Sequence, residues 1–272
     1  MSAAVVSQTL PSGRASSWRR RVIDRVDFVV AGVQKAGSTA LHHFISKHPH
    51  IALPRDQALH FFDKDENFER APDYNVLHGN FDPARRWLIA GEVTNDYTYW
   101  KPAMERIARY NPAMKIVISL RNPADRAFSH WNMRRAKNQE SEDFLAAIER
   151  DRSRPIEDSS LEAHRYAYVD RGLYAGQIER VFKFFPREQV FIIKYENFRA
   201  NYSRTLNSIF DFLGVKHLRG IRNKQRNAGP YQRKMTPEER EYVSAIFAED
   251  VTTLERLLGW DCSDWRFNPS AL

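Results

Sequence analysis

One short segment places a lysine, a glycine and two hydroxyl residues between an apolar run and a helical pattern. It follows the apolar run at 28–32 and reads Lys35, Ala36, Gly37, Ser38, Thr39 and Ala40. A strand, a turn and a helix N-terminus in this order present backbone N–H groups and the positive end of the helix dipole to an anion, and lysine adds a full charge. The segment therefore predicts a phosphate-binding loop.

The lysine of this loop does not stand where nucleotide kinases have theirs. In the Walker P-loop, Lys follows the second Gly directly and precedes Ser or Thr. Here Lys35 comes two residues before Gly37, and Ser38 follows that glycine. We therefore expect a phosphate-like ligand bound by the same physics, but not a Walker-type ATPase.

A second candidate anion site follows the apolar run at 115–120. Arg121 comes directly after this run, an Asn-Pro pair typical of a helix start comes next, and Ser129 lies eight residues beyond the arginine. A guanidinium together with a hydroxyl is a good receptor for a phosphate. In the alternative interpretation, Arg121 pairs with Asp125 and Ser129 only packs within the helix.

Apolar runs alternate with helical patterns along the chain. The runs predict strands at 27–31, 87–90, 115–120 and 189–193. The helical patterns cover 41–48, 123–137, 174–185, 202–213 and 236–258. This alternation predicts an α/β fold of three layers, P-loop-like, with a central and mainly parallel sheet between helices on both faces. Ligands of such sheets bind at the carboxyl ends of the strands, where both candidate anion sites lie.

Composition limits the class of protein. The chain has 272 residues, a net charge of +8 and one cysteine, Cys262, so it has no internal disulfide and fits a reducing compartment. No apolar run approaches the ~18 residues of a membrane span, and the N-terminus lacks the apolar segment of a secretory signal. We expect a cytoplasmic protein with a flexible tail at 1–25 and a single domain at 26–272.

Together these segments resemble the sulfotransferases that use 3′-phosphoadenosine 5′-phosphosulfate (PAPS). The loop at 35–40 looks like their 5′-phosphosulfate loop. Arg121 and Ser129 match their 3′-phosphate site, within a Leu-Arg-Asp-Pro-x-x-Arg-x-x-Ser pattern that here has Asn for Asp. The segments 60–63 and 91–97 are similar to segments of the heparan-sulfate branch, and 227–231 resembles the late loop that closes over the cofactor. The resemblance covers roughly Asp27 to the C-terminus and implies one sulfotransferase domain at 26–272.

The resemblance implies a role for each matching residue. PAPS would be the donor co-substrate, and Lys35 would stabilise its bridging oxygen and 5′-phosphate while the sulfuryl group passes to an acceptor hydroxyl on a carbohydrate or glycolipid. The residues expected to contact the cofactor beside the 35–40 loop are Arg121, Ser129, Gly229 and Tyr231. Those expected to contact the acceptor are His60, Asp63 and Asp96.

The catalytic base is less well defined by the pattern. The heparan-sulfate branch has a glutamate two residues before its histidine, where this chain has Ala58, and Gln57 stands where a lysine is common. We favour His60, which titrates near neutral pH and could be oriented by Asp63. Glu92 is an alternative base, and a residue elsewhere in the chain stays open.

The sequence argues against a catalytic metal, a phosphotransferase and a nucleic-acid-binding module. No third ligand lies near His60 and Asp63 in the sequence, so we expect no catalytic metal. A phosphotransferase would have an acid for Mg²⁺ at the end of a second strand, where this chain has Arg121. No nucleic-acid-binding signature accompanies the basic C-terminal stretch, so we expect no nucleic-acid partner. That stretch contains Arg219, Arg222, Lys224, Arg226, Arg233 and Lys234.

Overall fold

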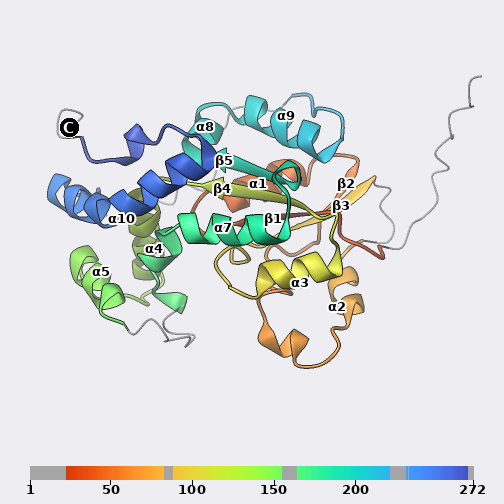
Figure 1. The fold of residues 1–272 in the computed structure, drawn as a ribbon, viewed down its shortest axis with the longest axis horizontal. Helices are drawn as coiled ribbons and strands as arrows, with labels where there is room; N and C mark the ends of the chain where they lie inside the picture. The colour runs from red at the N-terminus through yellow and green to blue at the C-terminus, as the bar shows by residue number, and fades with distance from the viewer. Residues whose placement is uncertain (1–22, 83–87, 155–163, 221–230, 232, 269–272) are drawn as a thin grey trace, which may run out of the picture.

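Five parallel strands form the centre of the protein. The computed structural model describes residues 23–82, 88–154, 164–220, 231 and 233–268. The strand order is β2-β3-β1-β4-β5, and every neighbouring pair runs parallel. The strands are β1 (Phe28–Gly32), β2 (Ile51–Ala52), β3 (Ile89–Val93), β4 (Lys115–Leu120) and β5 (Val190–Lys194). The predicted mainly parallel α/β sheet is confirmed (Figure 1).

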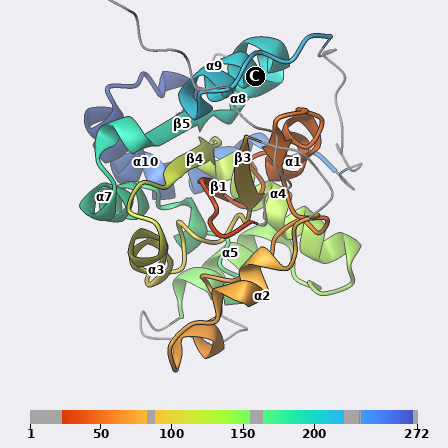
Figure 2. The ribbon, with the colours of Figure 1, turned by 90° about the vertical axis from the view of Figure 1, so that its right-hand side faces the viewer.

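Helices cover both faces of this sheet. In the first half of the chain they are α1 (Ser38–Ile45), α2 (Tyr74–His78), α3 (Ala103–Tyr110), α4 (Pro123–Ala136) and α5 (Phe144–Arg152). In the second half they are α7 (Ala175–Phe184), α8 (Tyr195–Ala200), α9 (Tyr202–Leu213) and α10 (Pro237–Leu258). Short 3₁₀ turns occur at Asp65–Phe68, Asp170–Gly172, Arg187–Gln189 and Ser263–Trp265. Figures 1 and 2 both show α8 and α9 on the opposite side of the sheet from α3.

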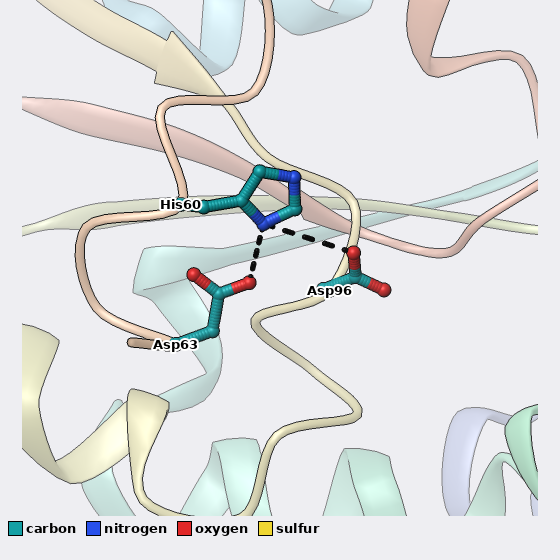
Figure 3. A group of neighbouring side chains, drawn as sticks. All are labelled: His60, Asp63 and Asp96. Atoms are coloured by element: carbon teal, nitrogen blue, oxygen red, sulfur yellow. Dashed lines mark hydrogen bonds and ion pairs between the residues drawn. The ribbon is translucent and has the colours of Figure 1, made fainter. Parts of the chain in front are cut away.

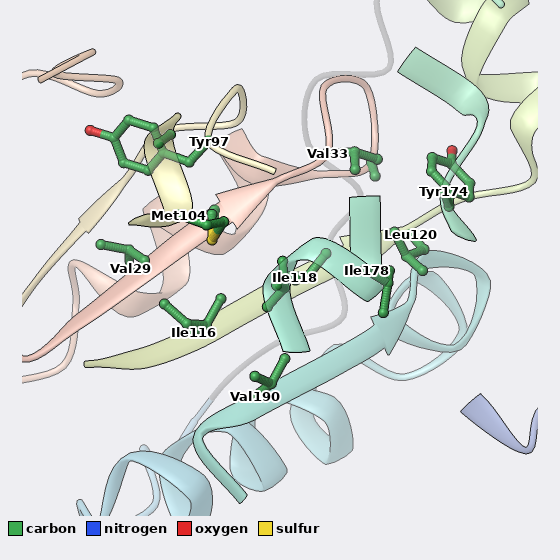
Figure 4. Close-up of a cluster of buried hydrophobic side chains, with 14 of the residues drawn as sticks. Val29, Val33, Tyr97, Met104, Ile116, Ile118, Leu120, Tyr174, Ile178 and Val190 are labelled. Carbon is green, nitrogen blue, oxygen red and sulfur yellow. The ribbon is translucent and has the colours of Figure 1, made fainter. Parts of the chain in front are cut away.

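Alternate strand residues build two separate cores, because successive side chains of a strand point to opposite faces. Val29, Ile116 and Ile118 pack with α3 and α7 in one cluster, which Figure 4 shows in close-up. Val30 and Val117 pack with α1, α8 and α9 in the other. The central strands are buried on both faces, so their sequences are continuously apolar rather than alternating.

The helix boundaries follow from local chemistry. Asn122 caps α4 by accepting hydrogen bonds from the next two free N–H groups, with Pro123 in the first turn. Thr236 and Glu239 form a capping box at the start of α10. Gly214 ends α9 in the left-handed conformation, with φ 78°. These three predicted boundaries are confirmed.

Two predicted elements differ from those observed. The strand predicted at 87–90 is β3 at 89–93, so Glu92 lies within a strand and pairs in register with Val29. The helix predicted from residue 41 begins at Ser38, inside the phosphate-binding segment. The two-residue strand β2 was not predicted, because it is too short to show a pattern.

The described chain begins inside the packed domain. Ile23 and Val26 are buried in the same core cluster as the sheet residues. The packed part therefore includes Ile23, which the predicted tail of residues 1–25 contained. Among the described residues, no helix is both long and apolar enough to cross a membrane.

Candidate functional site

The turn between β1 and α1 has the geometry of an anion-binding loop. Lys35 and Gly37 both adopt positive φ, 71° and 89°. Gly37 precedes α1 and no side chain caps that helix, so the N–H groups of its first turn stay available to a ligand. The Ser119 hydroxyl of β4 donates to the Ala36 carbonyl at 2.8 Å and fixes the loop from below.

The aromatic ring of Tyr195 packs closely against Gly37. A Cβ atom at this position would lie 2.8 Å from Cε2 of Tyr195, the first residue of α8. The turn therefore needs glycine both for its φ and for the close approach of Tyr195. Thr39 is exposed at the start of α1, and Gln57 donates to its hydroxyl at 3.5 Å. The segment that precedes His60 thus touches the phosphate-binding loop.

Arg121 connects the two predicted anion sites. Its Nη1 donates to the carbonyl oxygen of Lys35 at 3.0 Å, and its guanidinium lies 5.0 Å from the centre of the Tyr195 ring. Asp125 forms its ion pair with Arg240 at 2.8 Å, so the alternative pairing of Arg121 with Asp125 is not the one observed. Burial and then the neighbouring charge of Arg121 lower the pKa of Lys35 to about 8. The charges that act on the pKa of Lys35 are those of Arg121, Lys137, Arg126 and Arg134, all of them positive, so the site suits an anion.

The remaining predicted cofactor residues are placed unequally. Ser129 lies on α4 and is 4% exposed, so little of it is accessible at the surface. Tyr231 is exposed, and its ring centre lies 5.8 Å from that of Phe128 on α4. Burial lowers the pKa of Arg121, but Tyr231 beside it has the opposite effect, and the pKa is raised overall. Gly229 lies outside the described residues.

His60, Asp63 and Asp96 come together at the carboxyl end of β3 (Figure 3). His60 Nδ1 lies 2.6 Å from Asp63 Oδ2 and 3.8 Å from Asp96 Oδ2. The other ring nitrogen points away from both carboxylates. The hydrogen bond to Asp63 raises the pKa of His60, although burial opposes the shift. With a proton on Nδ1, Nε2 carries the lone pair that can accept a proton.

Asp96 is the third member of this cluster, although it lies more than 30 residues beyond the segment 60–63 in the sequence. Ligand atoms of His60, Asp63 and Asp96 all lie within 4.8 Å of one another, a spacing that a metal ion could use. However, Asp96 already pairs with Arg171, and Nδ1 of His60 already faces Asp63. A metal would have to displace both interactions, and the absence of a catalytic metal stays a prediction.

Glu92 is placed differently from a base that meets a substrate. Its side chain is fully buried, and Thr94 Oγ1 donates to its Oε2 at 3.1 Å. Burial raises the pKa of Glu92 to about 7, while hydrogen bonds from Tyr97 and Thr94 lower it. The carboxyl group has no exposed surface from which to reach an acceptor.

Two residues that contribute to the site, Arg171 and Tyr195, were not predicted from the sequence. Arg171, which pairs with Asp96, lies in the 3₁₀ turn Asp170–Gly172, 75 residues away, and gave no signal. Tyr195 directly follows β5, so the rule that ligands meet the carboxyl ends of parallel strands could have found it. A cavity of about 750 Å³ lies along β5, α8 and α9, and none of the predicted site residues lines it.

The basic C-terminal stretch lies partly outside the described residues. Its Arg233 forms a two-bonded ion pair with Glu239 and lies over the rings of Phe128 and Trp131. An arginine engaged in this way contributes to the packing of α10 on α4.

Two curated relatives match this chain over about 70% of its length. The chain is 29% identical over 211 residues to the human bifunctional heparan sulfate N-deacetylase/N-sulfotransferase 3, covering 72% of this chain and 23% of that protein. It is 26% identical over 190 residues to the mouse heparan sulfate glucosamine 3-O-sulfotransferase 3B1, covering 70% and 46%. The chain thus matches less than half the length of these curated relatives.

Solved structures match over most of the chain. A sulfotransferase from Alicyclobacillus acidocaldarius superposes with a TM-score of 0.75 at 29% identity, covering 89% of this chain and 99% of that one. The mouse sulfotransferase SULT7A1 complexed with PAP has a TM-score of 0.54 at 16% identity, covering 86% and 88%, and supports the fold alone. The family profile described as the sulfotransferase domain matches residues 25–228. The chain therefore belongs to the sulfotransferase family.

Proposed function

We propose that this protein transfers the sulfuryl group of PAPS to a hydroxyl group of a carbohydrate, free or as part of a glycolipid. The observation that carries the proposal is the hydrogen bond between Arg121 and the Lys35 carbonyl, which joins two cationic sites at the ends of β1 and β4. A donor with phosphate groups at both ends of its ribose needs two such sites. The carbohydrate acceptor rests on the names of the heparan sulfate relatives.

The transfer itself requires a base, a stabilised leaving group and an aligned acceptor. The acceptor oxygen would form a bond to sulfur as the bond between sulfur and the bridging phosphate oxygen breaks. His60 Nε2 would take the hydroxyl proton, and Lys35 would stabilise the charge that develops on the leaving phosphate. The products are a sulfate ester, adenosine 3′,5′-bisphosphate and a proton on His60.

The chain holds His60 in a suitable state for this role. Asp63 accepts a hydrogen bond from Nδ1–H of His60 and fixes the ring, which leaves Nε2 to accept a proton. The His60 side chain is 37% exposed, so a substrate can reach it. Asp96 and Asp63 could also accept hydrogen bonds from neighbouring hydroxyls of a sugar.

Ligand binding followed by transfer tests the proposal. Adenosine 3′,5′-bisphosphate should raise the unfolding temperature without added metal, whereas ATP with Mg²⁺ should raise it less. Incubation with ³⁵S-labelled PAPS and a panel of neutral and anionic oligosaccharides should then give a labelled product. A preference for ATP with Mg²⁺, or binding of the bisphosphate without transfer to any hydroxyl compound, would count against the proposed function.

A further inference from the structure

The segment that presents His60 has an unusual backbone. His60 and Ala58 both adopt positive φ, 52° and 62°, although neither is glycine. L-residues rarely adopt this conformation, and it persists only where surrounding contacts determine it. The Ala58 N–H donates to the Val93 carbonyl at 3.0 Å, which ties the segment to the end of β3.

Two side-chain hydroxyl groups accept hydrogen bonds from the backbone N–H groups of His60 and Phe61. Thr94 Oγ1 accepts from the His60 N–H at 3.4 Å. The Tyr97 hydroxyl accepts from the Phe61 N–H at 3.2 Å. A hydroxyl group that accepts a hydrogen bond in this way can still donate its own proton. Each of the two hydroxyl groups therefore needs an acceptor for that proton.

Glu92 lies beside both hydroxyl groups and offers an acceptor to each. Thr94 Oγ1 donates to Glu92 Oε2 at 3.1 Å. The Tyr97 hydroxyl is close enough to the same carboxyl group to lower its pKa, and among the described residues the buried Oε1 atom of Glu92 has no other hydrogen-bond partner. Glu92 and Tyr97 are both fully buried, so water does not compete for these contacts. The carboxylate therefore determines which way both hydroxyls point.

From this arrangement we infer that Glu92 is a positioning residue, which holds His60 through Thr94 and Tyr97. By accepting both hydroxyl protons, it turns the oxygen lone pairs toward the backbone of His60 and Phe61 and stabilises the left-handed turn. The ring of His60 is then placed independently by Asp63. This inference rests on the proposed role of His60 as the base.

The surroundings of Glu92 fit a positioning role better than direct proton transfer. His60 and Asp63 are the charged groups that act on its carboxyl group, and Thr94 and Tyr97 are its hydrogen-bonding neighbours. His60 Nδ1 is already engaged by Asp63, and Glu92 has no exposed atoms. Glu92 thus acts on His60 through the backbone.

Amide hydrogen exchange tests the contacts of Thr94 and Tyr97 separately and needs no substrate. In Thr94→Val the His60 amide should exchange at least ~10-fold faster, with Phe61 unchanged, whereas Tyr97→Phe should show the reverse pattern. In Glu92→Leu both amides should be affected. Tyr168→Phe is the matched control, because it removes another buried tyrosine hydroxyl, which donates to Glu140 at 2.8 Å. Unchanged exchange at His60 and Phe61 in all three variants would overturn the inference.

Kinetics distinguish positioning from a merely structural role and from direct catalysis. Thr94→Val and Tyr97→Phe should lower kcat about 10- to 100-fold with little change in the KM for PAPS, since a misplacement of about 1 Å has effects of this size. Glu92→Gln keeps an acceptor oxygen and should retain much more activity than Glu92→Leu. If Glu92→Gln were as inactive as His60→Ala, Glu92 would be the base and the inference would be wrong. If the wild-type protein transferred no sulfuryl group, the proposed function would fail, while the exchange pattern would still decide the positioning.

Discussion

The guanidinium of Arg121 donates a hydrogen bond to the main-chain carbonyl of Lys35, with 3.0 Å between Nη1 and O. The bond joins the end of β4 to the turn after β1, two segments that are 86 residues apart in the sequence. The distance between the two cationic sites is therefore set before a ligand arrives. A ligand with two separated phosphate groups gains from this arrangement, because the protein loses little freedom on binding it.

Arg121→Ala should weaken the binding of nucleotides that have a 3′-phosphate more than the binding of nucleotides that lack one. A hydrogen-bonded charge contributes about 1.5–3 kcal/mol, so affinity for adenosine 3′,5′-bisphosphate should fall about 10- to 100-fold. Affinity for AMP should fall less, because AMP lacks the 3′-phosphate. Isothermal titration calorimetry measures both, with Arg204→Ala, at an exposed position of α9, as the control. An equal loss for the two nucleotides would contradict the 3′-phosphate role of Arg121.

Gly37→Ala should damage the phosphate-binding loop. The residue adopts φ 89°, and the new methyl group would lie 2.8 Å from the Tyr195 ring. The left-handed conformation alone costs an L-residue roughly 1–2 kcal/mol, and the contact with the ring adds to this. Nucleotide affinity and the unfolding temperature should both fall. Gly176→Ala on α7 is the control: nothing lies near its Cβ position, so that variant should be neutral or slightly stabilised. Wild-type affinity in Gly37→Ala would argue against this loop as the binding site.

Features that depend on residues close together in the sequence were predicted, whereas contacts between residues far apart in the sequence were missed. Pro123, Asn122 and Thr236 act on their own helix ends, so local sequence suffices to place those boundaries. The continuous apolar runs at 28–32 and 115–120 predict the buried strands for the same reason. The contact between Asp96 and Arg171 spans 75 residues and depends on how the 3₁₀ turn Asp170–Gly172 packs. No local pattern encodes such a contact.

The role of Glu92 illustrates the same limit within a motif. Its position after Gly91 suggested an acid at a strand end, and β3 does end one residue later. Whether that acid faces a substrate or the interior depends on side-chain packing around Thr94 and Tyr97. The sequence therefore identified the chemistry of the residue, whereas its complete burial became evident only from the fold.

The pH dependence of turnover should reveal His60 and Asp63 as a pair. The hydrogen bond to Asp63 raises the pKa of His60 above 6.5. A base must be unprotonated, so kcat/KM should rise with pH through this raised pKa. Asp63→Asn should move the inflection to lower pH and also lower the plateau, because the ring loses its orienting carboxylate. Asp65→Asn is the control, since Asp65 pairs with Arg106 instead. An inflection that stays in place in Asp63→Asn would show that another group titrates.

The burial of Glu92 should also be visible in the stability of the folded protein. Its pKa is raised from 4.5 to about 7, so between these values the folded state holds a proton that the unfolded state has released. Stability should then fall as the pH rises through this window, by about 3 kcal/mol for a shift of this size. Glu92→Gln cannot ionise, so its free energy of unfolding should decline less over the same window.

Urea denaturation at several pH values between 4.5 and 8 measures that difference. Other groups that titrate in the same range, such as Asp151 with a pKa raised by burial to about 6, contribute equally to both proteins and cancel. The advantage of Glu92→Gln over the wild type should therefore grow steadily up to about pH 7 and then stay constant. A difference that does not change with pH would mean that Glu92 ionises as easily in the folded protein as in the unfolded chain, and would contradict the raised pKa expected from its complete burial.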